Sequence, residues 1–337
     1  MIASAILGAV VALAPFTPPI ALNVFAGDVL LVVAAGAVLR QVRPPWWLLA
    51  IAAAVGITTI WSAEPLASGM AAVRILAVGT VGLWLAHRGS LNPFLAGAAV
   101  TVVFNATVVG ASMWSGRAWG LAPTISTMGV IGMCLWIGAA GMDFRQRWLA
   151  WATWAVGIVS VVGPIARSPI VALGLFTGAR KRLWVPLGVT VALFVAVTVV
   201  NGGGERLTLS GIRSDAERRA ATIDGGGIYV QRQGAPEWDW RGVGFNAFVA
   251  AHGWPRPHNA YVLAWYELGV FMIVPASIIL WLGWRERWLR LPLIAFAVYG
   301  FLDDSMLHPA GVMALLFALV PPLLSTSSKS QAAQPGD

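Results

Sequence analysis

The strongest constraint in this sequence is a series of long apolar segments separated by short, mostly basic connections. A helix needs about 20 apolar residues to cross the hydrocarbon core of a bilayer, and fewer where it is broken or re-entrant. The sequence therefore predicts an all-α polytopic membrane protein with about 12 transmembrane helices. The predicted spans are 2–22, 24–39, 46–62, 70–86, 93–113, 123–142, 148–163, 168–179, 183–200, 258–284, 291–303 and 308–324.

Composition supports this class and excludes others. Only 11% of the residues are charged, 58% are hydrophobic and the mean hydropathy is +0.76, whereas a soluble domain carries about 25% charged residues. The net charge of +8 in so apolar a chain indicates basic cytoplasmic connections and phosphate-bearing lipids rather than nucleic acid. Cys134, the single cysteine, lies in an apolar run, which excludes a disulfide framework and a thiolate metal site.

The basic residues fall in alternate connections, which predicts the orientation. Connections rich in Lys and Arg stay in the cytoplasm, so both termini are expected there. We predict one transmembrane domain over 1–324, with a long outer loop at 201–257 between the ninth and tenth spans, and a short disordered tail at 325–337. The basic residues that set this orientation are Arg40, Arg43, Arg88, Arg145, Arg147, Arg180, Lys181, Arg182, Arg285, Arg287 and Arg290.

The outer loop is unusually rich in arginine. Two interpretations are open: a small solvated cap, or a cluster of guanidinium groups that binds a polyanion, since the planar fork of Arg matches phosphate oxygens. Ser214 and Glu217 form a capping-box pattern, which predicts a helix through about Ile223. The loop arginines are Arg206, Arg213, Arg218, Arg219, Arg232, Arg241 and Arg256.

Few ionisable residues lie within the predicted spans. Asp28 and Arg74 form a buried pair or line a lumen. Glu267 lies two to three turns into a span, where a carboxylate is costly and usually functional, although it could instead pair with a structural arginine.

A second group of ionisable residues lies at an outer helix end. Asp303, Asp304 and His308, with His252 or His258, could form a metal site of oxygen and nitrogen ligands. No ligand pair has a diagnostic spacing, so we expect no metal.

Three segments of the sequence stand out when they are taken in their order and topology. They are Ala166-Arg167-Ser168, then Leu207-Thr208-Leu209-Ser210-Gly211-Ile212-Arg213, and finally Gly242-Val243-Gly244-Phe245 followed by Pro257-His258-Asn259-Ala260-Tyr261 and Glu267-Leu268-Gly269. Together they resemble the O-antigen ligase and O-antigen polymerase superfamily of bacterial membrane glycosyltransferases. The resemblance covers about 160–285, and the motifs are specific in combination.

The resemblance implies a GT-C-like fold in the bacterial inner membrane. It implies transfer of a glycan from an undecaprenyl-diphosphate carrier to a hydroxyl of a glycan or lipid acceptor on the outer face, with inversion and without metal or cofactor. Arg167 and a second arginine, which is Arg213, Arg218 or Arg219, would clamp the diphosphate and neutralise the departing charge.

The resemblance leaves two roles open for His258. It could accept the proton of the acceptor hydroxyl, or it could bind the diphosphate while a carboxylate activates the acceptor. Asn259, Tyr261 and Glu267 are expected to bind substrate, although Asn259 and Tyr261 could also serve only to shape the start of their helix. The carboxylates that could activate the acceptor are Glu267, Asp303 and Asp304.

Two other functions compete with glycan transfer. A transporter or flippase of an anionic or lipid-linked substrate would place ionisable groups near the midplane and repeat its halves, whereas here most polar groups gather at one face. A peptidoglycan glycosyltransferase of the shape-and-division type would leave the His258-Asn259 motif unexplained.

Overall fold

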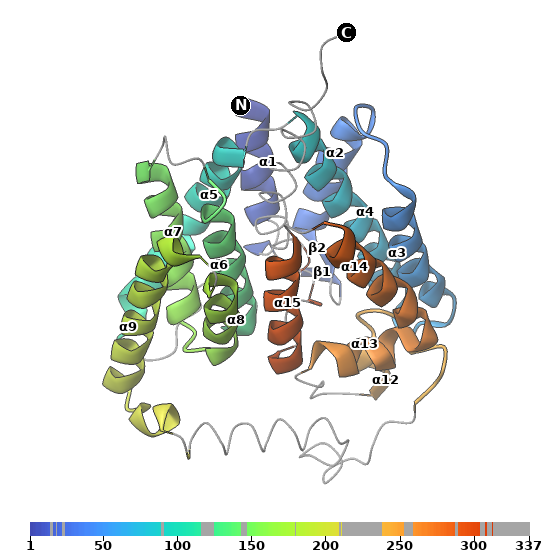
Figure 1. The fold of residues 1–337 in the computed structure, drawn as a ribbon. Helices are drawn as coiled ribbons and strands as arrows, with labels where there is room; N and C mark the ends of the chain where they lie inside the picture. The colour runs from blue at the N-terminus through green and yellow to red at the C-terminus, as the bar shows by residue number, and fades with distance from the viewer. Residues whose placement is uncertain are drawn as a thin grey trace.

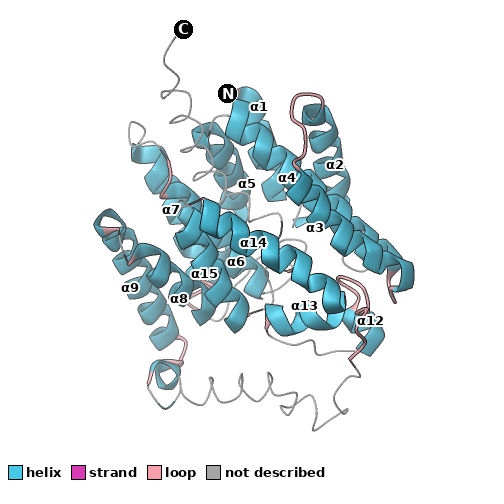
Figure 2. Ribbon diagram, turned by 45° about the vertical axis from the view of Figure 1, so that its right-hand side comes forward, coloured by secondary structure: helices cyan, strands magenta, loops and turns pink. Residues whose placement is uncertain are grey.

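A computed structural model describes most of the chain as a bundle of helices (Figures 1 and 2). The described residues are 1–13, 16–17, 19–21, 24–88, 91–115, 125–142, 147–178, 180–208, 210, 238–252, 259–286, 289–303, 307–308 and 312. The elements are α1 (Ile2–Leu13), β1 (Pro19–Ala21), β2 (Val24–Phe25), α2 (Ala26–Leu39), α3 (Trp46–Ile57), η2 (Thr58–Trp61), α4 (Pro65–Arg88), α5 (Leu91–Ser112), α6 (Ile125–Ala139), α7 (Arg147–Val162), α8 (Arg167–Thr177), η4 (Lys181–Leu183), α9 (Trp184–Val200), η5 (Gly204–Leu207), α12 (Phe248–His252), α13 (Ala260–Leu268), η6 (Gly269–Met272), α14 (Ile273–Arg285) and α15 (Arg290–Leu302).

The predicted helical class is confirmed for the part of the chain that the structure describes. Each predicted apolar segment from 2–22 to 291–303 overlaps at least one of these helices, whereas 308–324 lies almost wholly outside the described residues. Four helices are long and apolar enough to cross a membrane by length and composition. They cover Pro65–His87, Leu91–Ser112, Lys181–Val200 and Ala260–Arg285.

The predicted span 2–22 is not one continuous helix. Helix α1 ends at Leu13, and β1 pairs antiparallel with β2 before α2 begins. Proline explains the break, because its ring removes a backbone donor and clashes with the preceding turn, and the sequence carries three prolines at 15, 18 and 19. The first two predicted spans are therefore two short helices joined by a hairpin.

A buried ion pair fixes this hairpin to the bundle. In the first turn of α2, Asp28 accepts hydrogen bonds from Nε and Nη2 of Arg74 in α4, both at 2.7 Å, and from the backbone N of Phe25 at 2.8 Å. Both charged side chains are 1% exposed. Of the two interpretations left open by the sequence, the buried pair is confirmed.

Glycines allow several helices to approach closely. A Cβ at Gly8 of α1 would meet the backbone of Phe94 in α5, and one at Gly97 of α5 would meet the backbone of Ala5. Gly132 and Gly157 have the same role between α6 and α7. Small residues at helix crossings are typical of bundles in which packing, rather than the hydrophobic effect, holds helices together.

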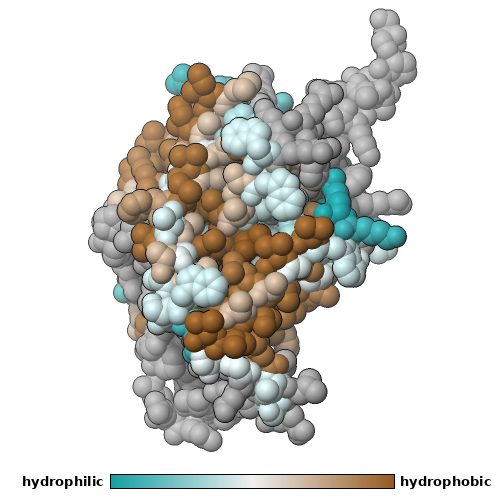
Figure 3. All heavy atoms as spheres, turned by 90° about the vertical axis from the view of Figure 1, so that its left-hand side faces the viewer, coloured by the Kyte–Doolittle hydropathy of each residue, from teal (hydrophilic) through white to brown (hydrophobic). Residues whose placement is uncertain are grey.

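The outer surface of the bundle is largely apolar. Figure 3 shows hydrophobic residues gathered on the left-hand side of the bundle in Figure 1. Large hydrophobic side chains that are exposed include Val100 and Phe104 of α5 and Val189 and Val199 of α9. Soluble monomers rarely expose apolar patches larger than a few hundred Å². The exposed side chains are those that a lipid environment would cover.

Candidate functional site

Half of the predicted site residues lie outside the described residues. These are His258, Arg213, Arg218 and Arg219, together with most of the predicted outer loop and its expected helix from Ser214. The other four, Arg167, Asn259, Tyr261 and Glu267, are described.

Arg167 opens α8, as its motif predicts. A tight turn precedes it, in which Ile165 N donates to Val162 O at 2.9 Å. Ile165 adopts φ +54°, a conformation that β-branched residues rarely adopt, and Ala166 is the extended N-cap of the helix. The turn leaves Arg167 partly exposed at the end of the bundle.

Asn259 caps α13 and ties it to α15. Its Oδ1 accepts from the backbone N of Tyr261 at 2.9 Å and of Val262 at 3.1 Å, and its Nδ2 donates to Phe301 O at 3.0 Å. The hydroxyl of Tyr261 donates to Ala297 O, also on α15, at 2.8 Å. Both side chains therefore use their polar atoms to clamp the start of α13 against the last turns of α15.

Glu267 lies near the end of α13 and is 3% exposed. Its Oε1 accepts from the backbone N of Phe248 at 3.3 Å, and this bond fixes the start of α12. Its backbone O accepts from Gly244 N at 3.0 Å. Glu267 thus joins α12, α13 and the Gly242–Gly244 turn in one network.

The Gly-x-Gly motif forms a sharp turn packed on the end of α13. Val243 N donates to Tyr266 O at 3.0 Å, and Val270 N donates to Trp240 O at 2.8 Å. Gly242 has φ +74° and Gly244 has φ +100°, which side chains rarely adopt. A Cβ at Gly244 would also meet the side chains of Ser62 and Ser68, so both conformation and space require glycine there.

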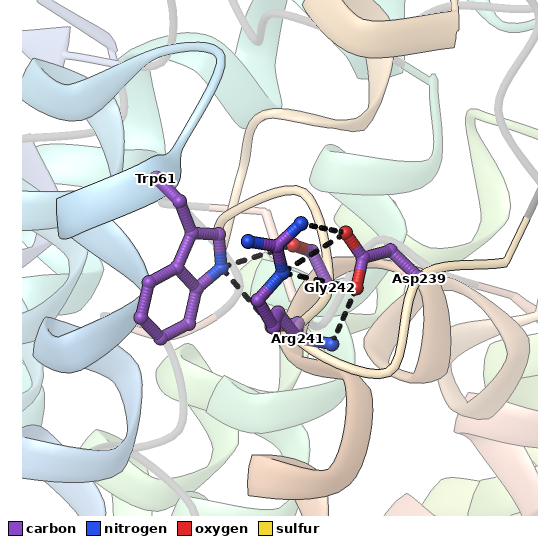
Figure 4. A network of polar contacts seen from close by, with 4 residues as sticks. All are labelled: Trp61, Asp239, Arg241 and Gly242. Carbon is purple, nitrogen blue, oxygen red and sulfur yellow. Dashed lines mark hydrogen bonds and ion pairs between the residues drawn. The ribbon is translucent and has the colours of Figure 1, made fainter.

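The opposite side of this turn contacts the connection between α3 and α4. Trp61 Nε1 donates to the carbonyls of Arg241 and Gly242 at 3.2 and 3.0 Å, as Figure 4 shows. Ser68 Oγ donates to Phe245 O at 2.8 Å, and the Oγ1 of Thr58 accepts from Phe245 N at 3.3 Å. The turn is therefore held between η2 with the start of α4 on one side and α13 on the other.

Arg241 forms a salt bridge with Asp239 through both Nε and Nη2, and motif analysis alone does not reveal it. Nε of Arg241 lies 3.2 Å from both carboxylate oxygens, and Nη2 lies 2.9 Å from Oδ2 (Figure 4). Hydrogen bonds from the side chain of Arg241 lower the pKa of Asp239, and the bonds to Asp239 raise the pKa of Arg241. This arginine is neutralised by its partner, so it is poorly suited to act alone as a phosphate clamp.

The start of α8, the start of α13 and the end of α15 lie at one end of the bundle. Helix α15 packs against both α8 and α13, and Figure 1 shows the end of α15 directed toward α13 and α12, with α8 beside it. Asp303 follows α15 at this end and is buried, whereas His308 is buried beside the α1–α2 hairpin, with its ring 5.9 Å from that of Phe25 in β2. Within the described part of the chain no three His, Cys, Asp or Glu side chains form a group that could hold a metal ion.

An aromatic pair adjoins this end and escapes motif analysis, because only the fold brings its members together. The rings of Trp238 and Trp265 are stacked, with centroids 5.1 Å apart and planes 6° apart.

No family of proteins, no curated protein and no solved structure gave a significant match to this chain.

Proposed function

We propose that the protein is a membrane glycosyltransferase that moves a glycan from a polyprenyl-diphosphate carrier to an acceptor hydroxyl at the outer face of the bacterial inner membrane. One observation carries this proposal: the Arg167 turn, the Gly242–Phe245 turn and the start of α13 after His258 belong to one end of the helical bundle. These belong to two of the three segments that resemble the O-antigen ligase and polymerase superfamily, whereas most of the third, 207–213, lies outside the described residues. Helix α15 packs against both α8, which Arg167 opens, and α13, which holds the Gly242–Phe245 turn.

A membrane location is supported by the helix ends as well as by the apolar surface. Trp46, Trp148, Trp184 and Trp284 are strongly exposed at the ends of α3, α7, α9 and α14. Each lies within a few residues of Arg or Lys in sequence, and Trp with basic residues is typical of the cytoplasmic membrane interface. We propose about 12 spans in a GT-C-like arrangement, with both termini in the cytoplasm and the Arg167 end outside.

In the proposed reaction the oxygen of the acceptor hydroxyl attacks the anomeric carbon of the donor sugar. The bond from that carbon to the diphosphate oxygen breaks, and the lipid diphosphate leaves with the electron pair. Arg167 and one of Arg213, Arg218 or Arg219 stabilise the developing negative charge, and inversion follows from direct attack.

The proton of the acceptor hydroxyl passes to His258, or to a carboxylate if His258 binds the diphosphate instead. Glu267 is a weaker candidate for this second route than the sequence suggests, because its carboxylate is buried and already accepts a backbone hydrogen bond. Asp303 is also buried, so either carboxylate would need the site to open before it could reach an acceptor.

Glycan transfer can be tested with Arg167→Ala and His258→Ala in proteoliposomes that contain a polyprenyl-diphosphate-linked oligosaccharide. Removing a cation that stabilises a transition state costs about 10²–10³ in rate, and removing a general base costs about 10²–10⁴. Arg40→Ala, at an exposed site at the opposite end of the bundle, is the matched control and should retain activity. Undiminished transfer in a folded Arg167→Ala protein would contradict the assigned role.

A transporter or flippase is the second candidate, and one feature favours it. The broken α1–α2 segment and the buried Asp28–Arg74 pair resemble the discontinuous helices and intramembrane charges of transporters. Movement of a lipid-linked oligosaccharide across liposomes without glycosidic bond formation would support this alternative. In that case Asp28→Asn should abolish the flux, while Arg167→Ala should leave it intact.

A further inference from the structure

The segment from Trp238 to Arg241 alternates aromatic and charged residues in the order Trp, Asp, Trp, Arg. Trp238 is 44% exposed, Trp240 is 57% exposed, and Trp265 of α13, stacked on Trp238, is 41% exposed. The Asp239–Arg241 salt bridge alternates with the two loop tryptophans in sequence and is also open to solvent. We call Trp238, Asp239, Trp240, Arg241 and Trp265 the tryptophan platform.

We propose that the tryptophan platform binds a neutral stretch of the acceptor glycan. A sugar ring presents an apolar C–H face and a rim of hydroxyls, and the platform offers both complementary surfaces in one place. Indole rings supply flat apolar area, and a carboxylate beside a guanidinium supplies charge-assisted acceptors and donors for hydroxyls. Within the described residues Nη1 of Arg241 has no hydrogen-bond partner, so both of its N–H groups remain for a ligand.

The charge balance of the platform selects among possible ligands. Asp239 neutralises Arg241, so an anionic group gains little there, and a phosphate would meet the carboxylate as well as the guanidinium. A lipid tail would have to bury an ion pair, which is costly in an apolar medium. An uncharged polyhydroxylated chain avoids both penalties.

The platform is also rigid before any ligand binds. The carbonyls of Trp240, Arg241 and Gly242 accept hydrogen bonds from Val270 N and Trp61 Nε1, and Gly242 N donates to Asp239 O at 2.9 Å. A preorganised surface loses less conformational entropy on binding than a flexible one. The stack with Trp265 fixes the platform directly to α13.

Position identifies the acceptor, rather than the donor, as the glycan that binds. Trp265 follows Asn259 by six residues, about 9 Å along the helix at 1.5 Å per residue, so the platform adjoins the segment that carries the proposed base. Arg167, the proposed donor ligand, opens α8, and α15 packs between α8 and α13. The platform therefore lies on the acceptor side of the proposed site, and this assignment rests on the proposed function.

Binding is testable without transfer. Full-length protein in nanodiscs is titrated with maltohexaose, a neutral soluble oligosaccharide, and observed by saturation-transfer difference NMR. Trp238→Ala and Trp265→Ala should each weaken binding about tenfold or more, and Asp239→Ala should weaken it as well. Trp46→Ala and Trp284→Ala, exposed tryptophans at other helix ends, are matched controls and should bind as wild type does.

Two results would overturn the proposal that the tryptophan platform binds a glycan. One is equal maltohexaose binding by wild type and by folded Trp238→Ala and Trp265→Ala proteins. The other is failure of these folded variants, and not of the controls, to reconstitute into phosphatidylcholine vesicles, because that result assigns the tryptophans to the membrane interface.

A transfer assay separates this inference from the proposed function. A rise in the KM for acceptor with an unchanged kcat in Trp238→Ala supports the platform. Wild-type protein that binds maltohexaose through Trp265 and transfers no glycan would refute the proposed function alone. Active transfer with an unchanged acceptor KM in both variants would refute the platform alone.

Discussion

His252 is the last residue of α12, and its ring lies among aromatic side chains. Ring centroids are 5.0 Å from Phe248 and 6.1 Å from Tyr266. Its Nε2 is buried and has no hydrogen-bond partner among the described residues. Burial lowers the pKa of His252, because the imidazolium would lose hydration that nothing nearby replaces.

This histidine should make α12 sensitive to acid. A folded-state pKa below the unfolded value means that the stabilisation is present at neutral pH and lost as pH falls below the unfolded pKa of about 6.5. We expect backbone amides of 248–252 to exchange faster at pH 5 than at pH 7.5, after correction for intrinsic rates. His252→Gln should remove most of this difference, and an unchanged pH dependence in that variant would rule out the histidine as its source.

Asn259 offers a second test at the scale of one side chain. Asn259→Ala removes the cap of α13 and should lower the free energy of unfolding by about 1 kcal/mol, with a further loss from the bond to Phe301 O. Asn259→Ser keeps a cap acceptor without adding a charge and loses the bond to Phe301 O, so its thermal midpoint should fall less. Equal midpoints for the two variants would show that the cap contributes little.

At the scale of elements, the sequence predicts most helices because apolar runs and prolines are local signals. It does not predict the break between α13 and α14, where one span is expected over 258–284. Gly269 adopts φ +54° there, and Val270 N donates to Trp240 O. The interruption depends on a turn nearly 30 residues earlier in the chain, which periodicity cannot reveal.

The Gly242–Gly244 turn supports the sharpest prediction about an element. Gly244→Ala places a Cβ against Ser62 and Ser68 at φ +100°, so we expect a loss of about 1–3 kcal/mol. Gly174→Ala in α8 meets no atom within 4 Å, and in a helix it should stabilise by about 0.5–1 kcal/mol. Thermal unfolding of both proteins checks the contrast, and a neutral Gly244→Ala would mean that the turn can readjust.

The candidate site is less predictable from sequence than the helices are. The motifs identify Arg167, Asn259 and Glu267 as candidate site residues. They do not reveal that the side chains of Asn259 and Glu267 form hydrogen bonds with neighbouring backbone groups. The stack of Trp238 on Trp265 joins residues 27 positions apart, and the Asp239–Arg241 salt bridge depends on turn geometry. Contacts of this kind follow from the three-dimensional arrangement and carry no sequence signature.

At the scale of the whole molecule, the Asp28–Arg74 pair should contribute strongly to integrity because both charges are buried. Asp28→Asn or Arg74→Ala leaves one uncompensated charge and should cost about 3–5 kcal/mol. The double variant Asp28→Leu/Arg74→Met removes both charges and should recover most of that loss. Asp239→Asn, in an exposed pair, should change thermal stability little, and similar losses for both pairs would contradict the importance of burial.

Orientation can be tested with cysteines placed at the two ends of the bundle. The native Cys134 is buried and should not react with a membrane-impermeant maleimide. Ser115→Cys, just after α5, should be labelled in intact cells, whereas Arg43→Cys, between α2 and α3, should be labelled only after permeabilisation. The reverse pattern would invert the proposed topology and move the site to the cytoplasm.

The hairpin between α1 and α2 also bears on how the chain is made. At 1.5 Å per residue the 12 residues of α1 and the 14 residues of α2 extend about 18 and 21 Å, less than the roughly 30 Å of a hydrocarbon core. Asp28 leaves the ribosome 46 residues before Arg74. In the proposed membrane topology, the first two helices therefore wait beside the insertion machinery during synthesis without the guanidinium partner of Asp28, and α4 completes their insertion when it delivers Arg74.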